Sequence, residues 1–408
     1  STASLASMVP AEPALALLKG NPNAKIPRTA SAALRRATPA VNAESAQIQK
    51  QLEQVAFLLR IPQRKQWDKM QDLVSQCREQ AARESVDGSA SKRQSILRDV
   101  QAGKVPEAEA LLDSLDVALA QVLRGIAYKD AVYSSKYLNV ALSQVSDVEL
   151  SQVGGLPYNL PRDLRARYPV LAGRSQIRLT VRKKAESQRQ YVLEDETRQD
   201  RVGELVIDLD GFSAPVTSGQ LLTNVRKGLY NGVSFVQDLN STALLVNPEL
   251  SRASGGGGGG NGAGAGGGGE EVIPLEIFEE GEFEPSYNRT LDVLDMEYPK
   301  LPMSIFGAVV MSHDAQSANK SSPENFFIYK FDESMGGLAG LSFDEGQFSV
   351  VGYVTAGEDL IGQVESGDVI ERVEILSGAD KLQLPPALTP APMPVSEEQQ
   401  QQQQQPAK

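Results

Sequence analysis

Between residues 43 and 150, apolar residues recur every three or four positions, which is the period of an amphipathic α-helix. The first helix predicted from this pattern ends at Arg60, before a proline, and a second extends from about Gln63 to Glu84. A third is expected from about Ser91 to Ala102, and further helices follow Pro106. Because each apolar stripe is one helix face wide, the segment is predicted to form an up-and-down helical bundle.

A different pattern organises the second half of the chain, from Gly203 to Phe235. It starts with alternating apolar and polar residues, which predict a strand, and passes through an Asp-Gly turn into a helix. Pro215 suits the first turn of that helix, and Thr217 with Gln220 has the spacing of a capping box. An Asn-Gly pair then predicts a tight turn into the strand that carries Phe235.

Alternation also predicts a half-buried strand from Ile177 to Val181. The charged run from Lys183 to Arg201 is expected to be an exposed hairpin, and a short strand is expected within it. Residues 174–384 are therefore predicted to form one β-rich domain behind the helical bundle. The fold class that follows is multidomain α + β.

Four segments have amino-acid compositions that are not expected to form a packed core. Residues 1–42 contain five prolines among alanine, serine and asparagine and are predicted to be a disordered arm. Residues 151–173 are rich in proline and glycine and are assigned as a linker. The nearly pure glycine segment 255–269 is expected to be a flexible insertion, and the proline- and glutamine-rich tail 385–408 to be disordered.

The amino-acid composition argues against several classes of function. The formal net charge of −12 argues against a nucleic-acid partner, whose binding surface should be basic. One cysteine excludes an internal disulfide, and one histidine leaves no material for a zinc site or a conventional hydrolase triad, so no metal or cofactor is predicted. No apolar run approaches the roughly 18 residues of a membrane-spanning helix. The sequence opens as if a targeting peptide had already been removed.

Blocks in the second half resemble, in the same order, those of the cyclophilin family of peptidyl-prolyl isomerases. The first is the organising stretch with its Tyr-Asn-Gly turn and the phenylalanine that follows it. The later blocks are Phe306-Gly-Ala-Val-Val-Met311-Ser-His-Asp, Pro323-Glu-Asn-Phe-Phe-Ile328, Phe348-Ser-Val-Val-Gly352-Tyr-Val and Gly367-Asp-Val-Ile370. Motif and context agree, which makes the match specific. The resemblance implies a closed antiparallel β-barrel.

Two phrases are similar to those of the large multidomain cyclophilins of the thylakoid lumen. They are Asp210-Gly-Phe-Ser-Ala-Pro-Val-Thr-Ser-Gly219 and Val351-Gly-Tyr-Val-Thr355. The resemblance implies a chloroplast protein of the thylakoid lumen that assists assembly and maintenance of photosystem II. It implies photosystem II subunits or their lumenal loops as partners, and a helical bundle that contacts the barrel within one chain.

The catalytic position of the family carries over to Gln237. Active cyclophilins place an arginine there, which donates towards the prolyl nitrogen and weakens the conjugation of the amide. A neutral glutamine donates more weakly than a charged guanidinium. The next family block should supply a phenylalanine and a glutamine, but residues 239–254 contain neither. The resemblance therefore implies a site that is degenerate, with weak or no isomerase activity.

The substrate groove of the family carries over in the same way to seven residues. They are Phe235, Met311, His313, Asn325, Phe327, Phe343 and Phe348. Met311 and Phe327 match the family residue, whereas His313 stands where an asparagine is expected. Phe343 lies nearest to the missing tryptophan, and Phe348 replaces the histidine of the pocket.

Three hypotheses remain open from the sequence. In the first, the protein is a degenerate cyclophilin that acts as a binding or chaperone-like assembly factor for photosystem II. In the second, it is an active isomerase with a relaxed site. In the third, the helical bundle binds a membrane-complex or phosphatase partner and the barrel is its scaffold.

Overall fold

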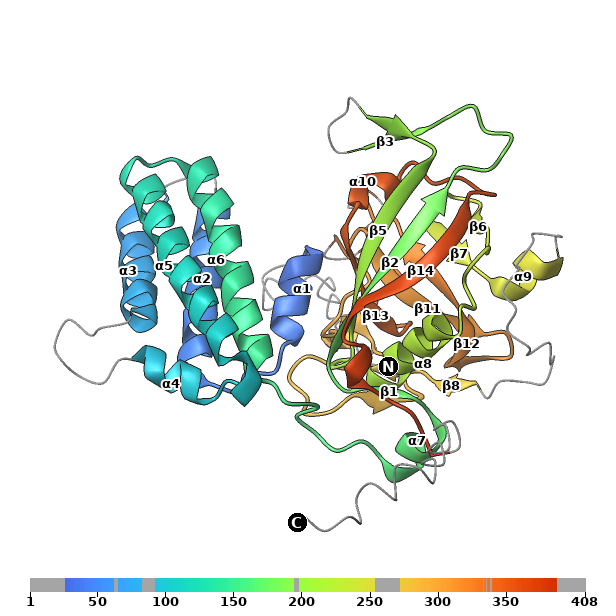
Figure 1. Cartoon of the computed structure of the whole chain (residues 1–408), viewed down its shortest axis with the longest axis horizontal. Coiled ribbons are helices and arrows are strands. Elements are labelled where there is room, and N and C mark those ends of the chain that lie inside the picture. Colours follow the sequence, from blue (N-terminus) through green and yellow to red (C-terminus); the bar gives the residue numbers. More distant parts are fainter. Residues whose placement is uncertain are drawn as a thin grey trace, which may run out of the picture.

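In the computed structural model of the chain, a helical domain lies beside a β-rich domain (Figure 1). The structure describes residues 26–61, 65–82, 92–193, 198–253, 272–332, 334, 336–337 and 340–386. The predictions for residues 1–25, for the glycine-rich insertion and for the tail beyond residue 386 lie outside the described residues.

In the described part of the chain, four long helices form the predicted bundle and pack around one core. The helices of this domain are α2 (Ala43–Arg60), α3 (Trp67–Ala81), α4 (Lys92–Arg98), η3 (Ala102–Lys104), α5 (Val105–Ala127) and α6 (Ala131–Gln152). Their buried residues follow the apolar stripes read from the sequence. The core includes Cys77, and burial raises the pKa of its thiol to about 12. This cysteine therefore packs as a small apolar residue.

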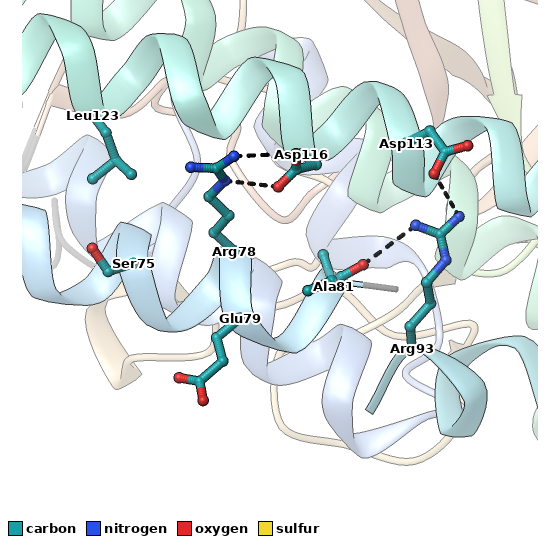
Figure 2. Close-up of a pocket in the computed structure, with 9 residues that line it drawn as sticks. Ser75, Arg78, Glu79, Ala81, Arg93, Asp113, Asp116 and Leu123 are labelled. Carbon is teal, nitrogen blue, oxygen red and sulfur yellow. Dashed lines mark hydrogen bonds and ion pairs between the residues drawn. The ribbon is translucent and has the colours of Figure 1, made fainter. Parts of the chain in front are cut away.

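Among the described residues, two ion pairs join the elements beside a hollow between α3 and α5 (Figure 2). Arg78 Nε lies 2.7 Å from Asp116 Oδ1, and both side chains are largely exposed. Arg93 of α4 is buried and lies 2.8 Å from Asp113 Oδ1. It also donates to the carbonyl oxygens of Ala81, the last residue of α3, and of Glu109. Arg93 thus ties the C-terminal end of α3 to α5.

Replacing Arg93 with methionine is expected to lower the free energy of unfolding by about 2 kcal/mol. Methionine keeps an apolar stem in place, but three acceptors, one of them at a helix end, lose their donor. Urea unfolding monitored by circular dichroism measures the change. Arg78→Met is the matched control, because an exposed ion pair contributes less than about 1 kcal/mol. Equal losses in the two variants would contradict this role of Arg93.

Residues 30–37 form helix α1 (Ala30–Ala37), so the prediction of a disordered arm is wrong for this part of residues 1–42. The Thr29 side chain accepts from the backbone N–H of Ala32 and begins the helix. α1 lies between α6 and the β-rich domain (Figure 1). Its apolar stripe, Ala30, Ala33, Leu34 and Ala37, is buried against that domain. A helix this short is not stable alone in water, so docking stabilises it.

The predicted linker, residues 151–173, is likewise more ordered than its composition suggests. α6 continues to Gln152, and the segment then forms α7 (Arg162–Arg167) and β1 (Val170–Leu171). β1 pairs antiparallel with β15 (Leu382–Gln383), close to the C-terminal end of the described chain. The second half of the predicted linker is therefore part of the β-rich domain.

Nine of the described strands form one antiparallel sheet. They are β2 (Arg174–Arg182), β5 (Val202–Asp210), β6 (Phe235–Gln237), β7 (Ala243–Val246), β8 (Ile273–Pro274), β11 (Ala308–Asp314), β12 (Ser317–Tyr329), β13 (Val350–Ala356) and β14 (Val369–Ser377). The order is β14-β2-β5-β13-β11-β12-β7-β6, with β8 beside β12. Shorter elements are β3 (Tyr191–Val192), β4 (Gln199–Asp200), α9 (Pro248–Ala253), β9 (Glu276–Ile277), β10 (Ser286–Tyr287), η4 (Val293–Asp295), α10 (Glu358–Ile361) and η7 (Ala379–Lys381).

The two edges of this sheet, at β6 and β14, meet through four backbone hydrogen bonds between residues 232–235 and residues 367–370. In the described chain they share one isolated bridge, between Ser234 and Val369. Beside it the Phe235 N–H donates to the Asp368 carbonyl at 2.8 Å. The domain is a curled antiparallel sheet around an apolar core, and the predicted closed barrel is not confirmed.

The organising stretch folds in the predicted order, as β5, α8 (Pro215–Arg226), a turn and β6. Pro215 begins α8 as expected, but the capping box is wrong. A buried carboxylate from β9, Glu276, instead accepts from the Thr217 N–H at 2.8 Å and from the Thr217 hydroxyl at 2.9 Å. Because Glu276 is remote in sequence, local spacing cannot reveal this cap.

Candidate functional site

Alternation along the central strands assigns the predicted groove residues to two faces of the sheet. On β11, Val309 and Met311 pack into the inner core, while Ala308 and Val310 pack on the outer face. On β12, the outer face carries Phe327. The outer face of β7, β12, β11 and β13 is therefore the surface on which a groove can form.

Two of the predicted groove residues do not lie on that surface. Phe235 and Met311 are fully buried and belong to the inner core. The prediction that they line the groove is wrong in this structure. The physical reason is the two-residue period of a strand, which turns each of them towards the apolar interior.

Three other predicted residues, His313, Phe327 and Phe348, are brought together, and we refer to them as the aromatic trio. The rings of His313 and Phe348 stack with centroids 4.0 Å apart and planes 11° apart. Phe327 meets Phe348 edge to face, with centroids 5.6 Å apart. His313 Nε2 lies 2.8 Å from the carbonyl oxygen of Gln347, which fixes the imidazole orientation. Phe327 is buried, whereas His313 and Phe348 are partly exposed, so these two rings supply the aromatic surface that could receive an apolar or prolyl side chain.

The segment that carries Phe348 is held by a buried carboxylate, Glu345. It accepts from the backbone N–H groups of Met303 and Ser304, each at 2.8 Å, and burial raises its pKa. Phe343, two residues earlier, is 83 % exposed. Within the part of the chain that the structure describes, its ring stacks on none of the aromatic trio and lies against Gly337.

Asn325 lies on β12 two residues before Phe327, on the same side of the strand. Its backbone N–H donates to Ser322 Oγ at 3.0 Å. The side-chain oxygen of Asn325 is buried and has no hydrogen-bond partner among the described residues. Because this oxygen is buried, the predicted groove role of Asn325 stays a prediction.

Gln237 is not brought together with the trio. Its side-chain nitrogen donates to the Val364 carbonyl at 2.9 Å, and its backbone N–H donates to Ser366 Oγ at 2.9 Å. β6 lies two strands away from β12, which corresponds to about 10 Å. The amide at the catalytic position is therefore engaged with the protein backbone.

Sequence reasoning missed the residues that complete the outer face. Leu245 of β7 pairs directly opposite Phe327, and Tyr329 meets Phe327 edge to face at 6.4 Å. Leu34 of α1 belongs to the same packed cluster. Strand alternation could have indicated that Tyr329 lies on the same face as Phe327. No local sequence pattern predicts that an N-terminal helix covers part of this face.

Among the described residues, no group of three or more His, Cys, Asp or Glu side chains is arranged to hold a metal ion. The described helices include none with the length and apolar character needed to cross a bilayer.

Comparison with known proteins matches both parts of the chain. Residues 29–153 match the family model described as "Peptidyl-prolyl cis-trans isomerase CYP38-like, PsbQ-like domain". Residues 193–380 match "Cyclophilin type peptidyl-prolyl cis-trans isomerase/CLD". The two models cover the helical domain and most of the curled sheet.

Three relatives match along most of their length. The chloroplastic peptidyl-prolyl cis-trans isomerase CYP37 of Arabidopsis thaliana is 37% identical over 90% of this chain and 73% of its own. A candidate thylakoid lumen peptidyl-prolyl cis-trans isomerase of Synechocystis sp. is 29% identical over 86% and 83%. The chloroplastic isomerase CYP38 of Arabidopsis thaliana is 26% identical over 92% and 79%.

Proposed function

The chain belongs to the cyclophilin family, and from that premise we propose that it is a catalytically degenerate member that binds extended protein segments in the thylakoid lumen. The clients are segments of photosystem II subunits, and the role is assembly and maintenance. The chloroplastic and thylakoid-lumen names of its relatives support the location.

One observation carries this proposal: the aromatic trio is assembled while the donor at the catalytic position is not free to act. The trio supplies an aromatic surface for an extended segment. Gln237 is bonded to Val364 and stands apart from them. The residues proposed to bind a segment are therefore in place, whereas the side chain that would polarise the prolyl amide is not available.

The chemistry explains why this loss matters. Prolyl isomerisation must cross a barrier of about 20 kcal/mol that is created by amide resonance. An enzyme lowers it only through contacts that are stronger in the twisted transition state than in the ground state. A donor to the prolyl nitrogen is such a contact, whereas ring stacking on the trio acts on both states alike.

A protease-coupled isomerisation assay on an X-Pro peptide tests the proposal with the full chain. We expect any acceleration to be at least about a hundredfold smaller than that of an arginine-bearing cyclophilin. Gln237→Arg is expected to leave the rate low, because the neighbouring phenylalanine and glutamine of the family are also missing. Efficient catalysis by the unmodified chain would instead support the alternative of an active isomerase with a relaxed site.

Binding is measured in parallel with fluorescent peptides from lumenal loops of photosystem II subunits. Phe348→Ala is expected to weaken their binding about tenfold, because it removes the ring that joins the trio. Phe57→Ala, an exposed phenylalanine on α2, is the matched control and should leave affinity unchanged. Equal affinity in wild type and Phe348→Ala would remove the groove from the proposal.

A second candidate function rests on the helical domain. Its match to a PsbQ-like domain and the exposed apolar residues Tyr128 and Val132 at the α5–α6 turn favour a partner-binding surface there. The partner would be a membrane complex or a phosphatase. Tyr128→Ser with Val132→Ser would then abolish partner capture while peptide binding at the groove stays intact.

A further inference from the structure

The loop between β9 and β10 presents a phenylalanine to solvent from a well-fixed backbone. The hairpin pairs Ser286 with Ile277, and the Ser286 hydroxyl donates to the Ile277 carbonyl at 2.9 Å. Within the loop, Phe278 is buried, with Lys300 Nζ 4.3 Å from its ring centroid. Phe283 at the tip is 90 % exposed. The fold therefore anchors one aromatic residue of this loop and leaves the other free for contact.

Hydrogen bonds to a neighbouring segment hold the same loop in place. The Glu280 N–H donates to the Tyr298 carbonyl at 2.8 Å, and the Lys300 N–H donates to the Phe278 carbonyl at 2.7 Å. The Glu282 N–H closes the turn by donating to the Glu279 carbonyl at 3.2 Å. A loop fixed in this way loses little conformational entropy when it meets a partner.

A second turn, residues 292–297, adds two more exposed apolar side chains. Leu294 is 69 % exposed and Met296 is 57 % exposed. The Asp292 side chain accepts from the Leu294 N–H at 2.8 Å, and Met296 adopts φ 65°, a left-handed backbone that methionine seldom takes. The structure thus fixes this turn as well, with its apolar side chains in solvent.

Arg289 joins the two turns into one surface. Its guanidinium lies 3.3 Å from Glu279 Oε2 in the hairpin loop and forms a second ion pair with Glu297 in the other turn. We call the joined region the Phe283 surface. It comprises the apolar residues Phe283, Leu294 and Met296 with the acidic residues Glu282, Glu284 and Asp295.

The charges of this surface are not neutralised within the described chain. The carboxylates of Glu282, Glu284 and Asp295 form no ion pair with any residue that the structure describes. Single exposed apolar residues are ordinary, but three on two joined turns, surrounded by like charges, are typical of an interaction site. Such a surface is complementary to an apolar patch with a basic rim.

We infer that the Phe283 surface is a docking site for a partner protein that offers an apolar patch rimmed by lysine or arginine. Phe283 supplies the central anchor, and the carboxylates steer and orient the basic rim. A second copy of this chain is a poor occupant, because its formal net charge is also −12. The inference is independent of the groove and of whether the proposed function is correct.

The test uses the full chain and a fluorescent amphipathic helical peptide of leucine and lysine as the probe. Fluorescence anisotropy at low and at physiological ionic strength gives its affinity. Phe283→Ser is expected to weaken binding at least about tenfold, as loss of an anchor does. The triple variant E282Q/E284Q/D295N is expected to weaken binding and to remove most of its salt dependence.

Two matched controls keep the test decisive. Val117→Ser replaces an exposed apolar residue on α5 that belongs to neither proposed binding surface, and D68N/D72N/E79Q removes three exposed charges from α3. Both should bind the probe as the unmodified chain does. Equal weakening by the control triple would show unspecific attraction and overturn the proposal. So would unchanged binding by Phe283→Ser, or self-association of the chain that Phe283→Ser abolishes without any binding of the probe.

Discussion

Replacing Asp368 with alanine is expected to lower the free energy of unfolding by about 3–5 kcal/mol. Asp368 forms an ion pair with Lys183 at 3.0 Å, and the two side chains are 0 % and 2 % exposed. Lys183 also donates to the Gln363 carbonyl at 2.5 Å. Without the carboxylate, the ammonium group would remain in an apolar environment with only a neutral acceptor.

The position of this pair increases the expected effect. The Asp368 side chain also accepts from the Tyr191 hydroxyl at 3.0 Å and from the backbone N–H groups of Lys184 and Glu365. Its backbone carbonyl accepts from the Phe235 N–H where the two edges of the curled sheet meet. Loss of Asp368 therefore removes a hydrogen-bonded network at the seam of the domain.

Urea unfolding monitored by far-ultraviolet circular dichroism measures this change in the free energy of unfolding. Glu371→Ala, on the strand β14 that begins directly after Asp368, is the matched control, because Glu371 pairs with Arg182 at the exposed surface. It should cost less than about 1 kcal/mol. The double variant Lys183→Met/Asp368→Leu should recover part of the loss, since no buried charge is left alone. Equal stability of Asp368→Ala and Glu371→Ala would contradict the importance of the buried pair.

A second large effect is expected from pH, through Glu149 of α6. This carboxyl group is 3 % exposed. Burial, and then repulsion by Glu53 of α2, raises its pKa from the ordinary 4.5 to about 8, while Arg174 of the β-rich domain opposes the shift. The groove beside Glu149 is lined by Arg36, Thr38, Ala40, Ala46, Gln49, Lys50, Glu53 and Glu280.

The sign of the effect follows from proton linkage. The folded chain holds the Glu149 proton more tightly than the unfolded chain, so this group stabilises the fold fully below about pH 4.5. That stabilisation is lost as the pH rises to about 8. Each pKa unit is worth about 1.4 kcal/mol, which sets an upper limit on the order of 5 kcal/mol.

Glu149→Gln is expected to flatten the pH dependence of stability and to stabilise the chain at pH above about 8. Unfolding free energies of the variant and the unmodified chain, measured across this range, give the contribution as their difference. Asp72→Asn, an exposed position on α3, is the control and should leave the pH profile unchanged. Parallel profiles for Glu149→Gln and the unmodified chain would show that Glu149 is not responsible.

Local pattern in the sequence predicted the elements that their own residues specify. The helical period defined the bundle because each stripe buries one face, and α2 ends at Arg60 as predicted. The organising stretch folds in the predicted order because strand alternation, Pro215 and the turn glycines each act on neighbouring residues. The family resemblance rests on the same local motifs, and the comparisons confirm it.

Contacts between distant residues were decided by the tertiary structure. Residues 30–37 have the composition of an arm but form a helix, because the outer face of the sheet buries their apolar stripe. Lys183 belongs to a charged run that was expected to be exposed, yet Asp368, remote in sequence, holds it inside. Glu276 caps α8 for the same reason, in place of the predicted capping box.

The candidate site shows the same division. The motifs identified the positions of His313, Phe327 and Phe348, but not that their rings meet. They also placed Phe235 and Met311 in the groove. In the structure, strand alternation turns both side chains into the inner core, where they are buried. Sequence by itself determined the helices of the bundle and the elements of the organising stretch, because propensity and period are local. Only the tertiary structure decided which faces are buried and which polar groups are paired, because burial and pairing depend on residues far apart in the chain.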